Sequence, residues 1–204
     1  KERKELFIKI ILPLILQENN QIEKDRKKLF KLLAKKSNNK EEKNWIKWKF
    51  KEYKIKNSDI SELKIRMDIV PVSIAIAQAA IESGWGTSRF ALEGNALFGQ
   101  WTYSGEGLKP LDLDNDDSKH KVMQFKILIA SVKAYKKNLN THSGYREFRD
   151  ARAMLRSQNE KVSGLKLTKY LDKYAAAGTK YIEIIELTIK KNSLSDFEDA
   201  KLLS

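Results

Sequence analysis

The feature that most limits the fold is an uncharged apolar run in the middle of a chain rich in lysine. Residues 69–81, IVPVSIAIAQAAI, contain no charged side chain, although 33% of the 204 residues are charged. A helix that is apolar on every side is stable only when other elements surround it. Pro71 is well placed for the first turn of such a helix, and Gly84 is well placed to end it. We therefore predict an apolar helix over residues 71–83, with Glu82 in its last turn.

The segments around this run also have helical periodicity, so we predict a mainly α fold. Helices are expected over residues 7–14, 22–35 and 45–53, with Pro13 kinking the first helix or beginning a new one. Further helices are expected after Asp59 and over residues 127–139, 145–156 and 180–191. The stretches QWTY and HKVMQF predict two strands of a small β-hairpin lobe. We expect residues 1–64 to form a basic helical N-terminal extension of a domain that covers residues 65–204.

Aromatic residues in the third helix, over residues 45–53, have two interpretations. Trp45, Trp48 and Tyr53 alternate there with lysines, which is typical of a surface that grips a membrane or a sugar chain. Aromatic residues at helical spacing more commonly form a core. The pattern alone favours the core.

The charge is concentrated in the first third of the chain. The net formal charge is +13, and residues 1–64 hold 19 Lys and Arg against 10 Asp and Glu. A basic surface suits an anionic partner, such as an anionic envelope surface, while a lysine-rich proteome would explain the same excess without any partner. The sequence has no zinc finger, recognition helix or RNA-binding motif beside this charge, so we expect no nucleic acid partner.

The cysteine content limits the possible covalent and metal chemistry, and the N-terminal sequence bears on membrane insertion and export. Cysteine is absent, which excludes disulfides and thiolate metal sites. The apolar run of residues 6–16 is too short to span a bilayer and is interrupted by Lys9 and Pro13. Because the chain begins with Lys1 rather than Met, we expect a removed leader or a trimmed terminus.

Glu82 is the first charged residue after the apolar run, and its position suits an acid catalyst. Gln78 lies one helical turn before it on the same face, which makes Gln78 a candidate for substrate binding. The negative end of the helix dipole and apolar neighbours such as Ile81 and Trp85 disfavour an ionised carboxylate. Both effects raise the pKa of Glu82, and a carboxyl group protonated near neutral pH can protonate a glycosidic oxygen. The alternative is a surface glutamate paired with Arg89.

Aromatic residues cluster after Glu82 in a segment rich in glycine. Flat aromatic faces stack on sugar rings, and glycines allow a ligand to approach the backbone closely. Core packing is the alternative for each aromatic residue taken alone. The candidates for substrate binding are Trp85, Phe98, Trp101 and Tyr103.

The stretch AQAAIESGWGTSRFALEGNALFGQW, residues 77–101, resembles the motif of bacterial N-acetylglucosaminidases of the lysozyme-like superfamily. These enzymes are peptidoglycan hydrolases related to the flagellar-rod muramidase domain, and the Bax-like branch is the most similar. The resemblance continues over residues 120–152 with the pattern H-V--F----ASV-AY--NLNTH and ends near Tyr174, Gly178 and Tyr181. It covers residues 66–192.

This resemblance implies a lysozyme-like helical domain with a small β lobe over the cleft. It also implies hydrolysis of the β-1,4 bond after N-acetylglucosamine in peptidoglycan glycan strands, in the periplasm or cell envelope. No cofactor is implied, and we expect a monomer. The matching positions are Glu82 for the catalytic acid and Ser83, Trp85 and Phe98 for the cleft.

Two parts of the implied catalytic centre stay open in the sequence. Tyr174 matches a tyrosine that lines the centre, but Tyr181 competes for that role. A second carboxylate would lie about 5 Å from the acid in a retaining enzyme and about 6.5–9.5 Å away in an inverting one, while a third route uses the N-acetyl group of the substrate as nucleophile. The candidates for the second carboxylate are Glu106, Asp112, Asp114, Asp116 and Asp117.

Several motifs favour other interpretations. Ala96 stands where many relatives have the Asn of an Asn-Leu-Phe-Gly motif, which places a hydrogen bond of that Asn in doubt. The acidic stretch DLDNDD has the aspartate spacing of a calcium loop but lacks its glycine and distal glutamate, so we expect no metal site. Residues 138–145 either cap two helices or line a sugar subsite; the polar residues concerned are Asn138, Asn140, Thr141, His142 and Tyr145.

Three hypotheses from two functional classes follow from these observations. The leading hypothesis is an endo-β-N-acetylglucosaminidase. A muramidase or lytic transglycosylase would cleave the other linkage of the same polymer. A non-catalytic module that binds cell-wall glycan through a degenerate lysozyme fold is the alternative from a different class.

Overall fold

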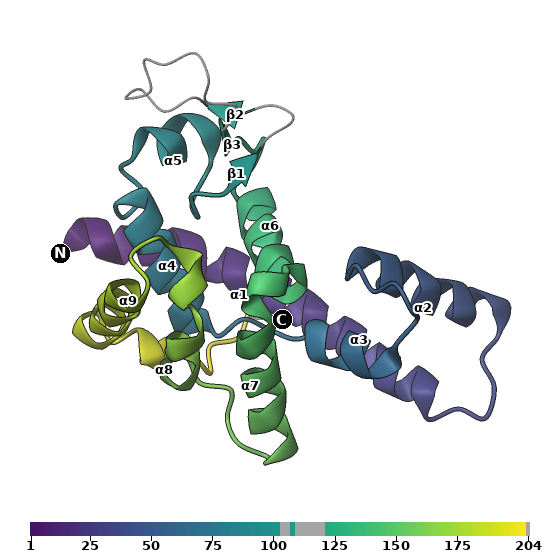
Figure 1. The fold of residues 1–204 in the computed structure, drawn as a ribbon. Coiled ribbons are helices and arrows are strands. Elements are labelled where there is room, and N and C mark those ends of the chain that lie inside the picture. Colours follow the sequence, from purple (N-terminus) through teal and green to yellow (C-terminus); the bar gives the residue numbers. More distant parts are fainter. Residues whose placement is uncertain (103–106, 109–120, 203–204) are drawn as a thin grey trace.

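Helices make up most of the structure, a computed structural model that describes residues 1–102, 107–108 and 121–202, without the side chains of Trp101 and Thr102 (Figure 1). The longer helices are α1 (Glu2–Leu33), α2 (Lys40–Glu52), α4 (Val72–Ser83), α6 (Leu128–Thr141), α7 (Arg146–Ser157) and α9 (Thr179–Lys191). The short helices are α3 (Ile60–Arg66), α5 (Arg89–Gly94) and α8 (Gly164–Leu167), with 3-10 turns η1 (Ser143–Tyr145), η2 (Thr168–Tyr170), η3 (Asp172–Tyr174) and η4 (Leu194–Phe197). This mainly α, lysozyme-like architecture confirms the predicted fold class.

The predicted apolar helix is α4, and several other helices pack around it. Residues 72–80 are all buried, from Val72 at 4% exposure to several residues at 0%. The helices α1, α8 and α9 and the turn η4 pack against α4. Because this helix carries no charge before Glu82, other elements can enclose it from residue 72 to residue 80. The end of the helix reaches the surface at Glu82, its first carboxylate.

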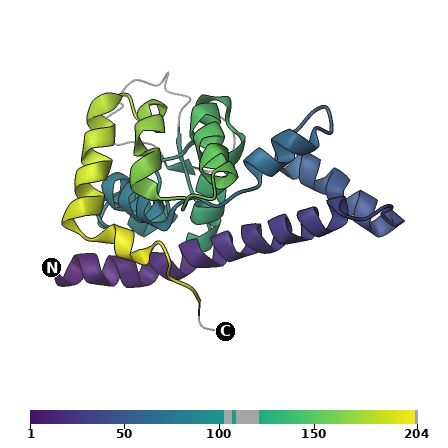
Figure 2. The same ribbon diagram turned by 90° about the horizontal axis from the view of Figure 1, so that it is seen from below.

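A single long helix, α1, replaces the two helices expected before residue 36 (Figure 2). Pro13 lies inside α1 on its exposed side, so the expectation that it begins a new helix was wrong. A proline removes one backbone hydrogen bond, and that loss is tolerated where water can reach the freed carbonyl group. The buried residues Phe7, Ile11 and Ile15 form an i, i+4 stripe in the same core as α4.

A second, smaller core lies where the later part of α1 meets α2 and α3. Its buried members include Leu29, Phe50 and Leu63. The α2 helix begins with a capping box, in which the side chains of Asn39 and Glu42 bond each other's backbone N–H groups. The domain boundary at residues 64 and 65 stays a prediction. Among the described residues, no helix is both long enough and apolar enough to cross a bilayer.

A small antiparallel sheet covers one end of the molecule next to α5 (Figure 1). Strand β3 (Lys121–Met123) lies between β1 (Trp101–Thr102) and β2 (Gly107–Leu108). Trp101 pairs with Val122, and Gly107 pairs with Met123. The two predicted strands are therefore present and paired, and β2 adds a third strand that the sequence pattern did not indicate.

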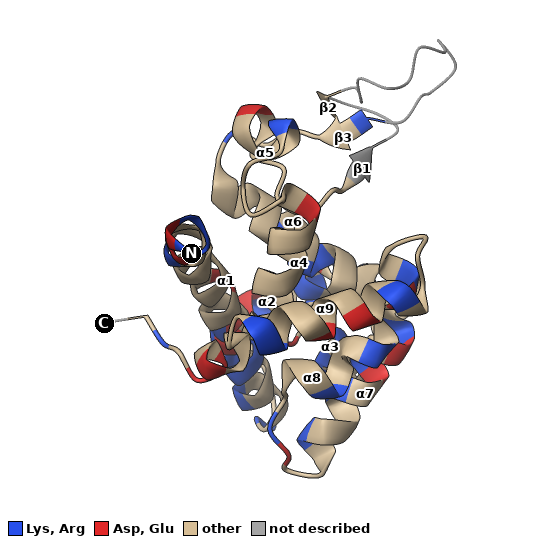
Figure 3. Cartoon of the chain, turned by 90° about the vertical axis from the view of Figure 1, so that its left-hand side faces the viewer, with Lys and Arg blue, Asp and Glu red and all other residues tan. Residues whose placement is uncertain are grey.

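Basic residues extend beyond the first third of the chain to the outer helices α7, α8 and α9 (Figure 3). Buried basic residues are held by defined partners. The carboxylate of Asp68, at 2% exposure, receives two hydrogen bonds from Arg156 and lies 3.9 Å from charged nitrogens of both Arg26 and Arg152. This cluster ties α1 and α7 to the segment that leads into α4.

Candidate active site

The turn after α4 fixes the position of Glu82. Gly84 ends the helix in the left-handed conformation with φ +58°, and Trp85 follows with φ +60°. The hydroxyl of Ser83 donates to the carbonyl of Ala79 and accepts a hydrogen bond of 2.9 Å from the backbone N–H of Gly86. Ser83 is fully buried, so its side chain shapes this turn from the inside.

A chain of hydrogen bonds leads from the interior to the Glu82 carboxyl group. The Tyr135 hydroxyl donates to Gln78 Oε1 at 2.6 Å, and Gln78 Nε2 donates to the Tyr181 hydroxyl at 3.1 Å. The Tyr181 hydroxyl donates in turn to Glu82 Oε1 at 2.7 Å. Because Gln78 supplies a donor to the Tyr181 oxygen, the single proton of Tyr181 is directed to Glu82.

The carboxyl group of Glu82 is half-buried, and burial raises its pKa, although the hydrogen bond from Tyr181 lowers it in part. This direction agrees with the prediction, and its cause is the burial that the prediction invoked beside the helix dipole. Arg89, the surface partner considered for Glu82, forms an ion pair of 3.3 Å with Glu93. Burial also raises the pKa of Tyr181, so that this residue stays a neutral donor.

Gly99 keeps space beside the second carboxyl oxygen. Its φ is +57°, and a Cβ atom at this position would lie 3.1 Å from Glu82 Oε2. A residue other than glycine would be strained here and would crowd this oxygen. Oε1 is occupied by Tyr181, so Oε2 is the oxygen left for a ligand.

Aromatic rings surround the carboxyl group on the interior side. Phe98 stacks on Tyr135 at 3.9 Å, and Tyr174 stacks on Tyr181 with centroids 5.6 Å apart and planes 2° apart. The Tyr174 hydroxyl donates to the backbone carbonyl of Phe98 at 3.0 Å. This cluster makes the wall behind Glu82 rigid and apolar.

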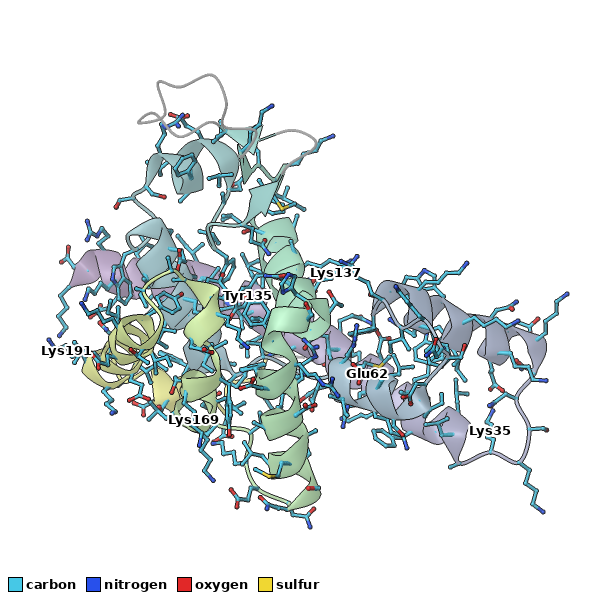
Figure 4. All side chains as sticks on the ribbon, in the orientation of Figure 1. Lys35, Glu62, Tyr135, Lys137, Lys169 and Lys191 are labelled. Atoms are coloured by element: carbon cyan, nitrogen blue, oxygen red, sulfur yellow. The ribbon has the colours of Figure 1, made fainter. Side chains whose placement is uncertain are left out.

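Glu82 opens onto a cleft of about 600 Å³. The cleft runs between α6, η1, η3 and the strand β3, and Glu82 is the one carboxylate among its described lining residues. Tyr135 points from α6 toward the interior, whereas Lys137 points from α6 toward α2 (Figure 4). Besides Glu82, the lining residues include Phe98, Gly99, Met123, Lys137, Asn138, Thr141, His142, Tyr145 and Tyr174.

The polar corner at residues 138–145 divides between lining the cleft and capping a helical turn. Asn138, Thr141 and Tyr145 line the cleft, while His142, which also lines it, caps η1 by accepting a hydrogen bond from Gly144. Asn140 points elsewhere: its side chain is 1% exposed and donates to the carbonyl of Asp68.

The structure brings some of the predicted site residues together and separates others. Gln78, Tyr174, Tyr181 and Phe98 gather around Glu82. Trp85 packs instead edge-on against Phe7 of α1 at 5.7 Å, with Lys4 above its ring, and does not line the cleft. The side chain of Trp101, together with Tyr103 and all five candidates for the second carboxylate, lies outside the described residues.

One tyrosine of the site, Tyr135, was missed as a site residue in the sequence. Tyr135 is fully buried between Phe98 and Gln78, whereas Tyr145, already considered for a sugar subsite, is 7% exposed beside Tyr174. The signal was a hydroxyl group on the apolar face of the helix over residues 127–139, since a buried hydroxyl requires a hydrogen-bonding partner. No group of three or more potential metal ligands occurs in the part of the chain that the structure describes, and the acidic stretch DLDNDD lies outside it.

A half-buried carboxyl group with a raised pKa, set in a polar cleft of a lysozyme-like fold, is typical of glycosidases. Residues 57–194 match the glucosaminidase family, described as mannosyl-glycoprotein endo-beta-N-acetylglucosaminidase, and the chain belongs to this family. Membership supports a glycosidase-type enzyme that acts on a glycan.

The chain is also similar to Protein bax of Escherichia coli strain K12. The two are 34% identical over 186 residues, which cover 88% of this chain and 66% of that protein. The resemblance to the Bax-like branch is thereby confirmed. No solved structure matches the chain.

Proposed function

We propose that the protein hydrolyses the β-1,4 bond after N-acetylglucosamine in the glycan strands of peptidoglycan, with Glu82 as the general acid. The observation that carries this proposal is the environment of Glu82: a raised pKa, one oxygen bonded by Tyr181, and the other oxygen beside Gly99 at the head of a cleft. A general acid must hold a proton near working pH and deliver it at a fixed position.

In this proposal each neighbour of Glu82 has a separate task. Tyr181 bonds Oε1, so the proton of the neutral carboxyl group is carried on Oε2, which faces the glycosidic oxygen. Gln78 orients Tyr181, and Gly99 leaves room for the leaving sugar. Tyr174 remains a candidate catalytic residue, because its ring lines the cleft within the same aromatic cluster.

The nucleophile is either a second carboxylate, a water activated by one, or the N-acetyl oxygen of the substrate. The five acidic candidates for the first two routes are those in residues 106–117. The substrate-assisted route needs Glu82 and a polar partner for the N-acetyl group, and Tyr174 and Asn138 both line the cleft with suitable groups.

The test is digestion of purified sacculi by wild type and by Glu82→Gln, with mass spectrometry of the released fragments. We expect the variant to lose activity by at least about a hundredfold, the scale on which general acid catalysis acts. Fold and glycan binding should persist because the amide is isosteric. Glu183→Gln, the same change at an exposed position of α9, is the control and should keep full activity.

The products separate the enzyme from its alternatives. Fragments with N-acetylglucosamine at the reducing end support the proposed specificity, and N-acetylmuramic acid ends or anhydro ends would assign a muramidase or a lytic transglycosylase. Normal activity of Glu82→Gln would refute the acid role. Binding of sacculi by the wild type without any product would favour the non-catalytic module.

We also propose that the protein acts in the periplasm or cell envelope, where its polymer lies. Four exposed lysines of α2 recur at helical spacing and would face an anionic envelope surface; they are Lys40, Lys43, Lys47 and Lys51. Fractionation of cells that express the full-length protein tests this location, and recovery in the cytoplasmic fraction would contradict it.

A further inference from the structure

A second pocket of about 410 Å³ lies between α1, α2 and α6, on the other side of Lys137 from the cleft. The residues that it takes from α1 and α2 precede residue 57, where the match to the glucosaminidase family begins. Part of the pocket wall therefore comes from residues outside the family match that contains Glu82.

Trp48 gives this pocket an aromatic wall. Its side chain is 54% exposed, whereas Trp45, one turn earlier, is partly buried against the second core. Lys49 lies 4.4 Å from the centre of the Trp48 ring and is itself held by ion pairs of 2.5 Å to Asp25 and 2.7 Å to Glu52. One face of the indole is thus supported by a buried, fixed ammonium group. A flat ring that is both rigid and exposed suits stacking on a ligand.

Two polar groups in the pocket accept no hydrogen bond from the described residues. The side-chain oxygen of Asn140 is buried and accepts no hydrogen bond there, although the amide nitrogen donates to the carbonyl of Asp68. The carboxylate of Glu18 likewise has neither a hydrogen bond nor an ion pair among the described residues. A buried acceptor without a donor is costly, so the Asn140 oxygen favours a donor beside it. The Glu18 carboxylate is partly exposed, so it can accept a hydrogen bond from a ligand in the pocket.

The charges around the pocket nearly cancel. Glu18, Asp25 and Glu52 stand against Lys49, Lys133 and Lys137, and the buried Lys136 is committed to the carbonyl of Ile15 and to Asn19. A balanced lining suits a neutral ligand with many hydroxyl and amide groups better than it suits a polyanion. An aromatic face, free acceptors and flanking ammonium donors are what a neutral sugar can use.

The pocket and the cleft are neighbours along one surface. Lys137 lines both of them, and the consecutive residues Tyr53 and Lys54 line the pocket and the cleft respectively. A polymer that leaves the cleft across Lys137 therefore arrives at Trp48.

From these observations we propose that the pocket between α1, α2 and α6 is a distal binding site for a saccharide segment of the same glycan strand, with Trp48 as its stacking platform. This inference rests on the proposed function, because it takes the strand in the cleft to be an N-acetylhexosamine polymer. The site would anchor long strands while Glu82 acts on a bond farther along.

The test is calorimetric titration of the inactive Glu82→Gln protein with peptide-free N-acetylglucosamine oligomers of increasing length. We expect affinity to increase with length until both sites are filled. Adding Trp48→Ala should weaken the binding of long oligomers about tenfold, the equivalent of 1.4 kcal/mol, and leave the binding of the disaccharide unchanged. Adding Trp48→Phe should restore most of the loss, because a flat ring remains.

Matched variants keep the result interpretable. Met154→Ala removes a side chain of similar exposure, 52%, from α7 and should change nothing. Glu18→Ala tests the same pocket without altering an aromatic residue and should also weaken only the long oligomers. If Trp48→Ala and Glu18→Ala both bind long oligomers like their parent, the inference is wrong while the role of Glu82 stands.

Other ligands would also overturn the inference. Titration with an isolated stem peptide, or with vesicles of anionic lipid, should give no binding that depends on Trp48. If either probe binds in a Trp48-dependent way and the oligomers do not, the pocket serves that ligand instead. If no oligomer of any length binds and the wild type cleaves no glycan, the proposed function itself fails.

Discussion

Removal of the Tyr181 hydroxyl tests how the structure sets the pKa of Glu82. Tyr181→Phe keeps the ring that stacks on Tyr174 at 5.6 Å but deletes the donor that lies 2.7 Å from Glu82 Oε1. This hydrogen bond favours the ionised carboxylate and opposes the effect of burial. Without it, burial acts alone and the pKa of Glu82 rises further.

The size of the shift follows from the difference between two hydrogen bonds. A hydrogen bond to a charged acceptor contributes about 1.5–3 kcal/mol and one to a neutral carboxyl group about 0.5–1.5 kcal/mol. The difference is of the order of 1 kcal/mol in favour of the ionised form. Because the carboxyl group is partly exposed and screened by water, we expect Tyr181→Phe to favour the protonated form of Glu82 by no more than about this amount.

The assay is the pH dependence of kcat/KM on a soluble glycan. The acid form of Glu82 is the active form, so activity falls on the alkaline side as the proton is lost, and this limb should move to higher pH in Tyr181→Phe. Tyr170→Phe, which removes a hydroxyl outside the cleft, should leave the limb in place. An unchanged limb, or one that moves to lower pH, would show that Tyr181 does not control the ionisation of Glu82.

Two further substitutions test the surroundings of the site. Gly99→Ala forces a side chain onto a backbone with φ +57° and places Cβ 3.1 Å from Glu82 Oε2. We expect kcat to fall at least about tenfold, which corresponds to about 1.4 kcal/mol of activation free energy. Wild-type kinetics would refute the role of this oxygen. Asp68→Ala leaves the guanidinium groups of Arg152 and Arg156 without their carboxylate. Chemical denaturation should therefore show a loss of about 3–5 kcal/mol in the free energy of unfolding. A loss below about 1 kcal/mol would contradict a stabilising role of Asp68 as the shared partner of these arginines.

Linkage gives these two carboxyl groups opposite pH dependences. Burial would raise the pKa of Asp68, but the nearby guanidinium groups of Arg152, Arg156 and Arg26 hold it below its ordinary value. The stability that Asp68 contributes is therefore present above its unfolded pKa and is lost as the pH falls through the folded one. The pKa of Glu82 is raised, so its contribution is complete below the unfolded pKa and is lost as the pH rises through the folded one.

Local signals made α4 and the position of Glu82 predictable. The uncharged run, the glycine after it and the first carboxylate all lie within residues 69–84, and each acts through neighbours in the sequence. The strands β1 and β3 were predicted for the same reason. By contrast, the partner of Glu82 is Tyr181, and Gln78 reaches the same tyrosine 103 positions away in the sequence. No periodicity links residues at such a separation.

Trp85 and Pro13 show where a local pattern has more than one structural solution. Trp85 stands beside Glu82 in the sequence, but the left-handed turn at Gly84 sends its ring toward Phe7 of α1. Pro13 commonly interrupts a helix, yet it lies on the exposed side of α1, where its missing hydrogen bond costs little. The packing of Trp85 and the continuity of the helix at Pro13 both depend on whether the side chain faces another helix or solvent.

Asn19 shows how the basic N-terminal helix is joined to the elements that carry the site. Its side chain donates to the carbonyl of Val70 at 2.9 Å and accepts from the N–H of the same residue, immediately before α4. The buried amino group of Lys136, on the helix that lines the cleft, donates to Asn19 and to the carbonyl of Ile15. Burial lowers the pKa of Lys136 well below its ordinary value, so only close acceptors from α1 make this position tolerable. Packing is thus continuous across the change in charge near residue 64, and the cationic helix helps to hold both α4 and α6 in place around Glu82.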